Sequence, residues 1–408
     1  MKRLFTFLSI IVLTFGALFA QTSDLTLREV LNFINKDSLK RTVQDMQAFE
    51  SRLCNQTKGQ NRKVAQYLVD RLHSYGIEEA RIDSFYIAGT YWLVGNYAQY
   101  MYNVLGTLKG TGKTDSTVII GAHLDAISYI KVASEYLLTP TAPGADDNAT
   151  GCAVMIEMAR IIYENNLKPH HNIDFMAYDA EEADLLGSRD DAKKRRAANE
   201  KIIVMLNNDM VGNQPDDKPW EVSLRWYENS LDITKKAEQA LLTYTIVKPI
   251  RAEIPNSAGS DSYSYFLENY KVNFAIENNF SPYYHSVNDL AEHLNFEYCR
   301  EIAKMNFVLL DYYAGIHLPL SIKQDNIKLD NLIEVFPSPA NDVIRVHNCN
   351  DIVINKIDIY DISGRLMVSL PIQMQQQNII RLDNFCVGIY FMRIHTDKGI
   401  VNKKIIKN

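Results

Sequence analysis

Between Val118 and Ser188, short apolar segments alternate with acidic motifs, and this pattern constrains the fold more than any other part of the chain. The segments Val118–Gly121 and Ile173–Tyr178 have the length and composition of buried strands. The segment Ala149–Tyr163 between them has apolar residues at helical spacing. Strands that alternate with helices are typical of a sheet covered on both faces. We therefore predict an α/β domain with a mixed, mostly parallel sheet flanked by helices.

Polar residues that can bind a metal follow both predicted strands and precede the helix. These residues are His123, Asp125, Asp146, Asp147, Glu181 and Glu182. Ligand sites of open α/β sheets form outside the carboxyl ends of the strands. Buried carboxylates are costly unless they are paired or bound to a metal. A histidine among several carboxylates at this edge therefore points to a divalent metal, and zinc suits nitrogen and oxygen ligands best.

Two later motifs complete this set. Asp209 follows the apolar segment Ile202–Leu206, and His285 follows the segment Val272–Ile276. Each motif alone has a simpler explanation, since paired acids before a helix can be caps and first-turn residues, and Glu-Glu can begin a solvated helix. Their joint position beside buried strands or a buried helix favours a metal site.

The remaining helices and strands of this domain are expected on both sides of the central stretch. Residues 25–75 have a helical pattern, and Arg81–Tyr86 and Met101–Leu108 have the composition of strands. Asp190–Lys201 is so highly charged that we expect a solvated helix, and Ala291–Ala314 is expected to end the domain as a helix.

In chain order, the motifs HLD, GADDNATG, AEE, NDM and YYHS resemble those of the secreted di-zinc aminopeptidases. That group includes bacterial leucyl aminopeptidase and, more distantly, glutaminyl cyclases and glutamate carboxypeptidases. The resemblance spans roughly residues 52–317 and implies two bound Zn²⁺ ions. It implies that His123 and Asp209 bind one ion. Glu182 and His285 would bind the other, and Asp146 would bridge both.

The resemblance also implies roles for residues beside the ligands. Glu181 would be the general base that takes a proton from water. Asp125 would orient His123, because a metal-binding histidine usually donates its second ring nitrogen to a carboxylate. Asp147 would support the bridging residue, and the peptide bond between Asp146 and Asp147 would be cis.

The first 20 residues have the pattern of a secretory signal peptide. Lys2 and Arg3 precede an apolar run that ends at Ala20. An uncleaved membrane anchor is the alternative, although the run is barely long enough to span a bilayer. We expect a soluble mature protein, secreted or held at the cell surface, with residues 21–318 as the peptidase domain.

Composition fits a globular enzyme and excludes some classes of partner. The net charge is −6 at pH 7, which argues against nucleic acid or an anionic membrane. A chain of 408 residues should form more than one domain. The five cysteines show no CxxC spacing, and Cys152 falls on the buried side of its predicted helix as a packing residue.

The pattern changes after residue 318. Residues 319–331 are polar and are expected to form a linker, and residues 332–408 consist of short alternating strands separated by turns, as in a small all-β sandwich. The opening Phe-Pro-Ser-Pro-Ala-Asn, the sequence from Gly388 to Phe391 and the basic end resemble the sorting domain of the type IX secretion system. The resemblance implies that the secretion machinery recognises this module, and a carbohydrate-binding or spacer sandwich is the alternative.

Together, these motifs predict a secreted metallo-aminopeptidase that acts on peptides. Alternatives on the same scaffold are a glutaminyl cyclase, which usually keeps one zinc, and a carboxypeptidase or dipeptidase. An inactive binding protein is the alternative outside the enzymes, and the intact Glu181 argues against it. One departure from the family pattern, Gly259-Ser-Asp261-Ser262 in place of Ser-Asp-His, leaves the contacts to substrate open.

Overall fold

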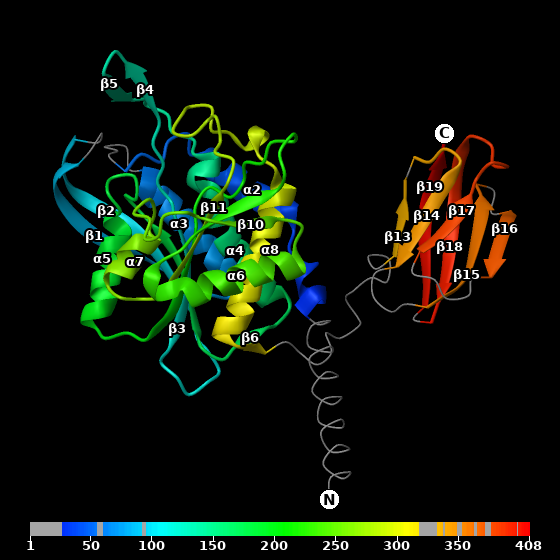
Figure 1. Ribbon diagram of the computed structural model, residues 1–408, viewed down its shortest axis with the longest axis horizontal. Coiled ribbons are helices and arrows are strands. Elements are labelled where there is room, and N and C mark those ends of the chain that lie inside the picture. Colours follow the sequence, from blue (N-terminus) through cyan, green and yellow to red (C-terminus); the bar gives the residue numbers. More distant parts are fainter. Residues whose placement is uncertain are drawn as a thin grey trace, which may run out of the picture. The chain divides into compact units, whose positions relative to one another are not determined.

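The chain forms two compact units, Met1–Leu320 and Ser321–Asn408 (Figure 1). The computed structural model describes residues 27–54, 60–91, 95–317, 333–337, 339–348, 353–362, 365–371, 377–397 and 399–408. The predicted signal peptide and linker lie outside these residues. No helix within the described ranges is both long enough and apolar enough to cross a membrane.

An eight-stranded sheet forms the centre of the first unit. Its strands, in order across the sheet, are β1 (Arg81–Tyr91), β2 (Gly95–Leu108), β7 (Asn172–Tyr178), β3 (Thr117–His123), β8 (Ile202–Asn208), β11 (Val272–Glu277), β9 (Glu221–Arg225) and β10 (Lys248–Arg251). The four central strands β7, β3, β8 and β11 are parallel. Antiparallel pairing joins β2 to β7 and β9 to β11. The predicted mixed, mostly parallel sheet is therefore confirmed.

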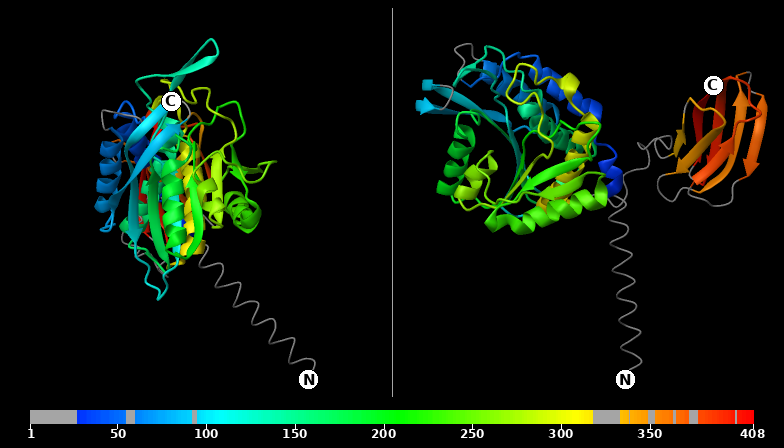
Figure 2. Two further views of the ribbon diagram at one scale, coloured as in Figure 1. Left: turned by 90° about the vertical axis from the view of Figure 1, so that its left-hand side faces the viewer. Right: turned by 45° about the horizontal axis from the view of Figure 1, so that its top comes forward.

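Helices cover both faces of this sheet (Figure 2). One face carries α3 (Gln60–Ser74), α4 (Gly151–Glu164), α6 (Leu231–Tyr244) and α8 (Phe296–Ala314), with α2 (Lys36–Gln47) packed on α4 and α8. The other face carries α5 (Leu186–Ala197) and α7 (Ser262–Leu267). Helix α4 is buried along most of its length because it lies between the sheet and other helices. This explains why its sequence is apolar on nearly every side.

Short elements connect the larger ones. They are β4 (Tyr129–Val132), β5 (Glu135–Leu138), η1 (Ala145–Thr150), β6 (Lys168–Pro169), η2 (Glu228–Ser230), η3 (Ala291–His293) and β12 (Ile316–His317). Strands β4 and β5 form a hairpin that projects from the unit (Figure 1). Segment η1 leads directly into α4 and carries the two adjacent aspartates.

The helix predicted over Asp190–Lys201 is present as α5, but it is solvated on one side only. Helix α5 covers one face of the sheet and buries Asp191 and Arg195. The guanidinium of Arg195 lies 2.7 Å from Asp191 and 2.7 Å from Asp174 on β7. Charged residues are rarely buried unless they are paired. Some charged residues of this segment therefore form a buried ion-pair network, and the others are exposed to solvent.

Cysteine side chains of the first unit serve as packing residues. Cys54, Cys152 and Cys299 are buried and unpaired. The Sγ atom of Cys152 on α4 lies 3.2 Å from the carbonyl oxygen of His123 at the end of β3. The prediction that Cys152 is a packing residue on the buried side of its helix is confirmed.

The second unit is a sandwich of two antiparallel sheets. One contains β13 (Ile333–Phe336), β14 (Val343–Asn348) and β17 (Gln377–Arg381), and the other contains β16 (Leu366–Pro371), β15 (Ile354–Asp361), β18 (Gly388–Thr396) and β19 (Gly399–Lys407). Ile344 and Val346 from the first sheet share one core with Ile357, Met392 and Ile394 from the second. Alternate residues of β18 face this core, as expected for strands with one buried face. The predicted all-β sandwich is confirmed.

Candidate metal centre

The carboxyl ends of the four central parallel strands meet at one edge of the sheet. His123 is the last residue of β3, and Glu181 and Glu182 follow β7. Asp209 directly follows β8, and His285 lies in the loop after β11. Because all four strands point in the same direction, residues distant in sequence are brought together at this edge.

The side chains form two groups that share one aspartate. In the first, Nε2 of His123 lies 3.2 Å from Oδ1 of Asp147 and 3.4 Å from Oδ1 of Asp209. In the second, Nε2 of His285 lies 3.1 Å from Oδ2 of Asp147 and 3.2 Å from Oε2 of Glu182. The two oxygens of the Asp147 carboxylate therefore face different histidines.

The prediction that Asp146 lies between the two groups is wrong by one residue. Its Oδ1 accepts a hydrogen bond of 2.9 Å from the backbone N–H of Gly212, and its carboxyl group lies against Glu277. The helical backbone of this segment is interrupted at Asp147 (φ −105°, ψ 93°), directly after Asp146, so the two side chains do not follow one regular helix. Asp147 faces the histidines while Asp146 faces away. The cis peptide bond also differs from the prediction, since it joins Asp147 to Asn148.

The geometry of the donor atoms fits zinc. Zinc bonds to histidine nitrogen and carboxylate oxygen are about 2.0 Å long, which places neighbouring ligands of a tetrahedral site about 3.3 Å apart. The four distances between histidine nitrogen and carboxylate oxygen, from 3.1 to 3.4 Å, match this spacing. Among the described residues, His123–Asp147–Asp209 and Asp147–Glu182–His285 are both sets that could hold an ion. The residues present therefore fit two divalent ions with Asp147 between them.

The clustered carboxylates of the site favour positive charge beside them, as the pKa values of the site residues show. Burial lowers the pKa of His285, but Glu182 and Asp147 together outweigh burial and raise that pKa to about 11. Burial also lowers the pKa of His123, whereas Glu181 and Asp209 raise it. The net result is a pKa well above the ordinary value. Burial raises the pKa of Glu181, and repulsion from Glu182 adds to this effect. Divalent cations would supply the positive charge that the histidines supply here.

Asp125 connects the end of β3 to the loop after β7. Its Oδ1 accepts a hydrogen bond of 3.0 Å from the backbone N–H of Glu181, and its Oδ2 accepts one of 3.2 Å from Glu182. Its own carbonyl oxygen lies 3.1 Å from Nδ1 of His123, and its carboxylate lies 3.5 Å from the same nitrogen. The side chain predicted to orient His123 thus also fixes the position of the Glu-Glu pair.

Sequence reasoning missed two residues that hold the loops of the site. Asp289 accepts hydrogen bonds from the backbone N–H groups of Asp146 and Asp147, at 2.9 and 3.0 Å. Arg52 is fully buried and donates to the carbonyl oxygens of Leu124 and Gly144, at 2.8 and 2.7 Å. Asp289 follows the YYHS motif closely in the sequence, and this closeness could have indicated a role in the site. Nothing in the sequence around Arg52 indicates its contacts.

A cavity of about 230 Å³ opens directly onto this cluster. Its lining includes His123, Asp147, Glu181, Glu182 and Asp209. The cavity is therefore the place where a bound molecule would meet the ions and the general base.

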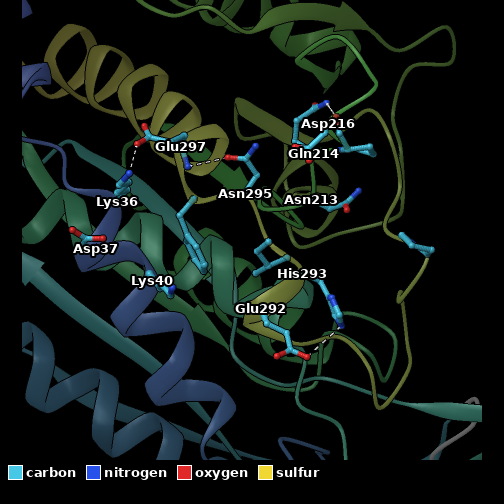
Figure 3. A pocket seen from close by; sticks show the side chains of 14 residues that line it. Lys36, Asp37, Lys40, Asn213, Gln214, Asp216, Glu292, His293, Asn295 and Glu297 are labelled. Carbon is cyan, nitrogen blue, oxygen red and sulfur yellow. Dashed lines mark hydrogen bonds and ion pairs between the residues drawn. The ribbon is translucent and has the colours of Figure 1, made fainter. Parts of the chain in front are cut away.

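A wider hollow of about 680 Å³ lies elsewhere, beside the start of α8 (Figure 3). Lys36 and Glu297 form an ion pair of 2.6 Å across it, and Asn295 caps the helix. Tyr283 stacks on His293 at a ring separation of 4.2 Å. Among the described residues, none of the sets that could hold a metal includes a residue of this hollow. The metal centre and this hollow are separate features.

The chain is similar in sequence to leucine aminopeptidases and similar in fold to a zinc aminopeptidase and a glutaminyl cyclase. A probable leucine aminopeptidase from Arthroderma otae is 27% identical over 281 residues, which cover 67% of this chain and 71% of the relative. A zinc aminopeptidase from Bacillus subtilis has a similar structure (TM-score 0.57, 14% identity, 71% of this chain and 97% of that chain). A glutaminyl cyclase from Bacteroides thetaiotaomicron bound to N-acetylhistamine shares the fold as well (TM-score 0.55, 19% identity, 68% and 97%).

Family-level matches cover both units of the chain. Residues 334–408 match the secretion system C-terminal sorting domain, in agreement with the resemblance of the β-sandwich sequence. Residues 103–310, just over half of the chain, match Peptidase family M28, and this segment contains every residue of the two metal-binding groups. The chain belongs to Peptidase family M28 and carries a C-terminal sorting domain for secretion.

Proposed function

We propose that this chain is a secreted aminopeptidase that removes N-terminal residues from peptides with two Zn²⁺ ions. One observation carries the proposal. The Asp147 carboxylate lies between two histidine–carboxylate groups, and Glu181 stands beside them at the cavity. The leucine aminopeptidase relatives support the same activity.

Each residue of the site has a distinct task in this proposal. His123 and Asp209 would hold one ion, His285 and Glu182 the other, and Asp147 would bind both. Two such ions polarise a scissile carbonyl and lower the pKa of a water molecule.

Glu181 has the position expected for the general base. Its carboxylate lies 3.9 Å from Nε2 of His123, near the ligands but further from the ring than Asp147 or Asp209. It lines the cavity, so it can take the proton of the attacking water and pass it to the leaving amine. Asp125 positions Glu181 through the backbone hydrogen bond described above.

The metal content of the protein tests the first part of the proposal. Since the residues fit two ions, elemental analysis of the purified chain is expected to give two zinc ions per chain. Chelation is expected to abolish peptide hydrolysis, and added zinc is expected to restore it. Full activity in a protein with one tightly bound ion would contradict the shared role of Asp147.

The reaction itself is tested with a panel of substrates. We expect release of the first residue from amino-acid amides and from unblocked peptides, and no release from N-blocked peptides, as measured by mass spectrometry. Loss of ammonia from N-terminal glutamine without cleavage would instead identify a glutaminyl cyclase. Release from the carboxyl end would identify a carboxypeptidase.

The sorting domain leads to a prediction about export. We propose that residues 1–20 direct the chain to the periplasm and that the type IX machinery recognises the β-sandwich. A chain that ends at Leu320 contains the whole first unit. It is expected to fold and hydrolyse peptides but to remain inside the cell envelope, as measured by activity in cell fractions. A truncated chain that cannot fold would show that the two units depend on each other.

A further inference from the structure

The cavity beside the metal centre is lined by an arginine as well as by the acidic residues. The apolar and aromatic residues of the lining are Met210, Phe274, Ile276, Phe280 and Tyr284. Beside these residues the lining includes Arg225, Ser257 and Gly259. A cavity of about 230 Å³ has room for one side chain of a bound molecule.

The pairing of two strands directs Arg225 into this cavity. Arg225 is the last residue of β9 and lies opposite Phe274 of β11 in an antiparallel pair. Side chains of directly opposed residues lie on the same face of a sheet. Because Phe274 lines the cavity, Arg225 reaches the same space beside it.

The guanidinium of Arg225 makes neither a hydrogen bond nor an ion pair within the described residues. Arg225 is half-buried, yet it forms no hydrogen bond or ion pair with another residue in the described ranges. Other buried arginines behave differently, since Arg195 pairs with two aspartates and Arg52 donates to three carbonyl oxygens. A guanidinium presents five N–H donors and no acceptor, so its natural partner is a carboxylate.

We propose that Arg225 binds the side-chain carboxylate of a substrate whose first residue is glutamate or aspartate. The inference rests on the proposed function, because it places the first residue of the peptide in the cavity beside the metal centre. The methylene groups of such a side chain would pack against Phe274 and Ile276. Its carboxylate would reach Arg225, and Ser257, which also lines the cavity, would offer its hydroxyl as a further donor.

Matched substrates test the proposal on the zinc-loaded, full-length chain. Glutamyl and glutaminyl p-nitroanilides differ in charge but hardly in size, and neither has a free α-carboxylate. The glutamyl substrate is expected to have a kcat/KM about 10–100-fold higher than the glutaminyl substrate, as expected for a charge-assisted hydrogen bond. Leucyl p-nitroanilide serves as the uncharged, apolar reference.

Two variants separate recognition from general effects. Arg225→Met keeps an unbranched side chain without charge, and it is expected to remove the preference for glutamate while leucine is still hydrolysed. Arg225→Lys keeps the charge but not the planar fork, and it is expected to restore part of the preference. Both variants should bind two zinc ions, because Arg225 belongs to neither metal-binding group.

Each outcome has a definite meaning. A wild-type enzyme that hydrolyses leucyl p-nitroanilide but prefers glutamine to glutamate would overturn the role of Arg225 and leave the aminopeptidase proposal standing. An equal loss for all three substrates in Arg225→Met would show that Arg225 only balances charge, and would also overturn it. If a preference for an acidic group appears only with dipeptides, Arg225 binds an α-carboxylate instead, and the stated role is again wrong. Failure to cleave any p-nitroanilide with two zinc ions bound would reject the proposed function itself.

Discussion

Replacing Glu181 by glutamine is expected to lower kcat at least ~100-fold while both zinc ions remain bound, since general acid–base catalysis is typically worth ~10²–10⁴-fold. Glutamine has the size of glutamate but cannot take the proton of the attacking water. Asp125 accepts the backbone N–H of residue 181, so this contact remains after the substitution. Initial rates with a peptide substrate and elemental analysis of the same sample measure the two quantities. KM should change far less than kcat.

The adjacent glutamate provides the matched control for this experiment. Glu182→Gln changes the same chemical group one residue away, but it removes a carboxylate that lies 3.2 Å from Nε2 of His285. Its metal content is therefore expected to fall together with its activity. Near-normal turnover in a fully metallated Glu181→Gln protein would show that Glu181 is not the base.

Replacing Asp147 by asparagine is expected to reduce both metal content and activity, the latter by more than ~100-fold. Residues that only support a metal ligand already cost ~10–100-fold when they are changed, and Asp147 faces both histidines directly. An amide has one oxygen and cannot bind two ions as a carboxylate does. Elemental analysis and peptide hydrolysis of the purified variant measure both effects.

Asp146→Asn is the control that separates the two neighbouring aspartates. Burial raises the pKa of Asp146 to about 6. Burial also raises the pKa of Glu277, and the neighbouring Asp146 raises it further. The side-chain oxygen of asparagine can accept the N–H of Gly212, and its NH₂ group can donate to Glu277. This variant is expected to keep its zinc and most of its activity. Loss of zinc in Asp146→Asn, with retention in Asp147→Asn, would restore Asp146 as the bridging residue.

The sheet and the edge that carries the metal centre could be predicted because both depend on local patterns. Apolar runs such as Val118–Gly121 and Ile173–Tyr178 identify buried strands, and the polar residues after each run must lie where the strands end. His123 at the end of β3 and Asp209 after β8 were found in this way. Neither required knowledge of a distant contact.

The choice between Asp146 and Asp147 could not be made from such patterns. Both residues follow the same glycine and alanine, and their directions depend on contacts from far along the chain. Asp289 accepts both backbone N–H groups, and Gly212 donates to Asp146 alone. Arg225 escaped detection for a similar reason, since only the pairing of β9 with β11 brings it to the cavity.

The thiols of the first unit have a consequence for a chain that is marked for secretion. Cys54, Cys152 and Cys299 are buried and unpaired, and burial raises the pKa of each thiol above its ordinary value. Thiols react with oxidants as thiolates, so these three are poorly reactive. Disulfides form readily outside the cytoplasm but not within it. We therefore expect these three cysteines to remain free thiols when the chain moves from a reducing to an oxidising compartment.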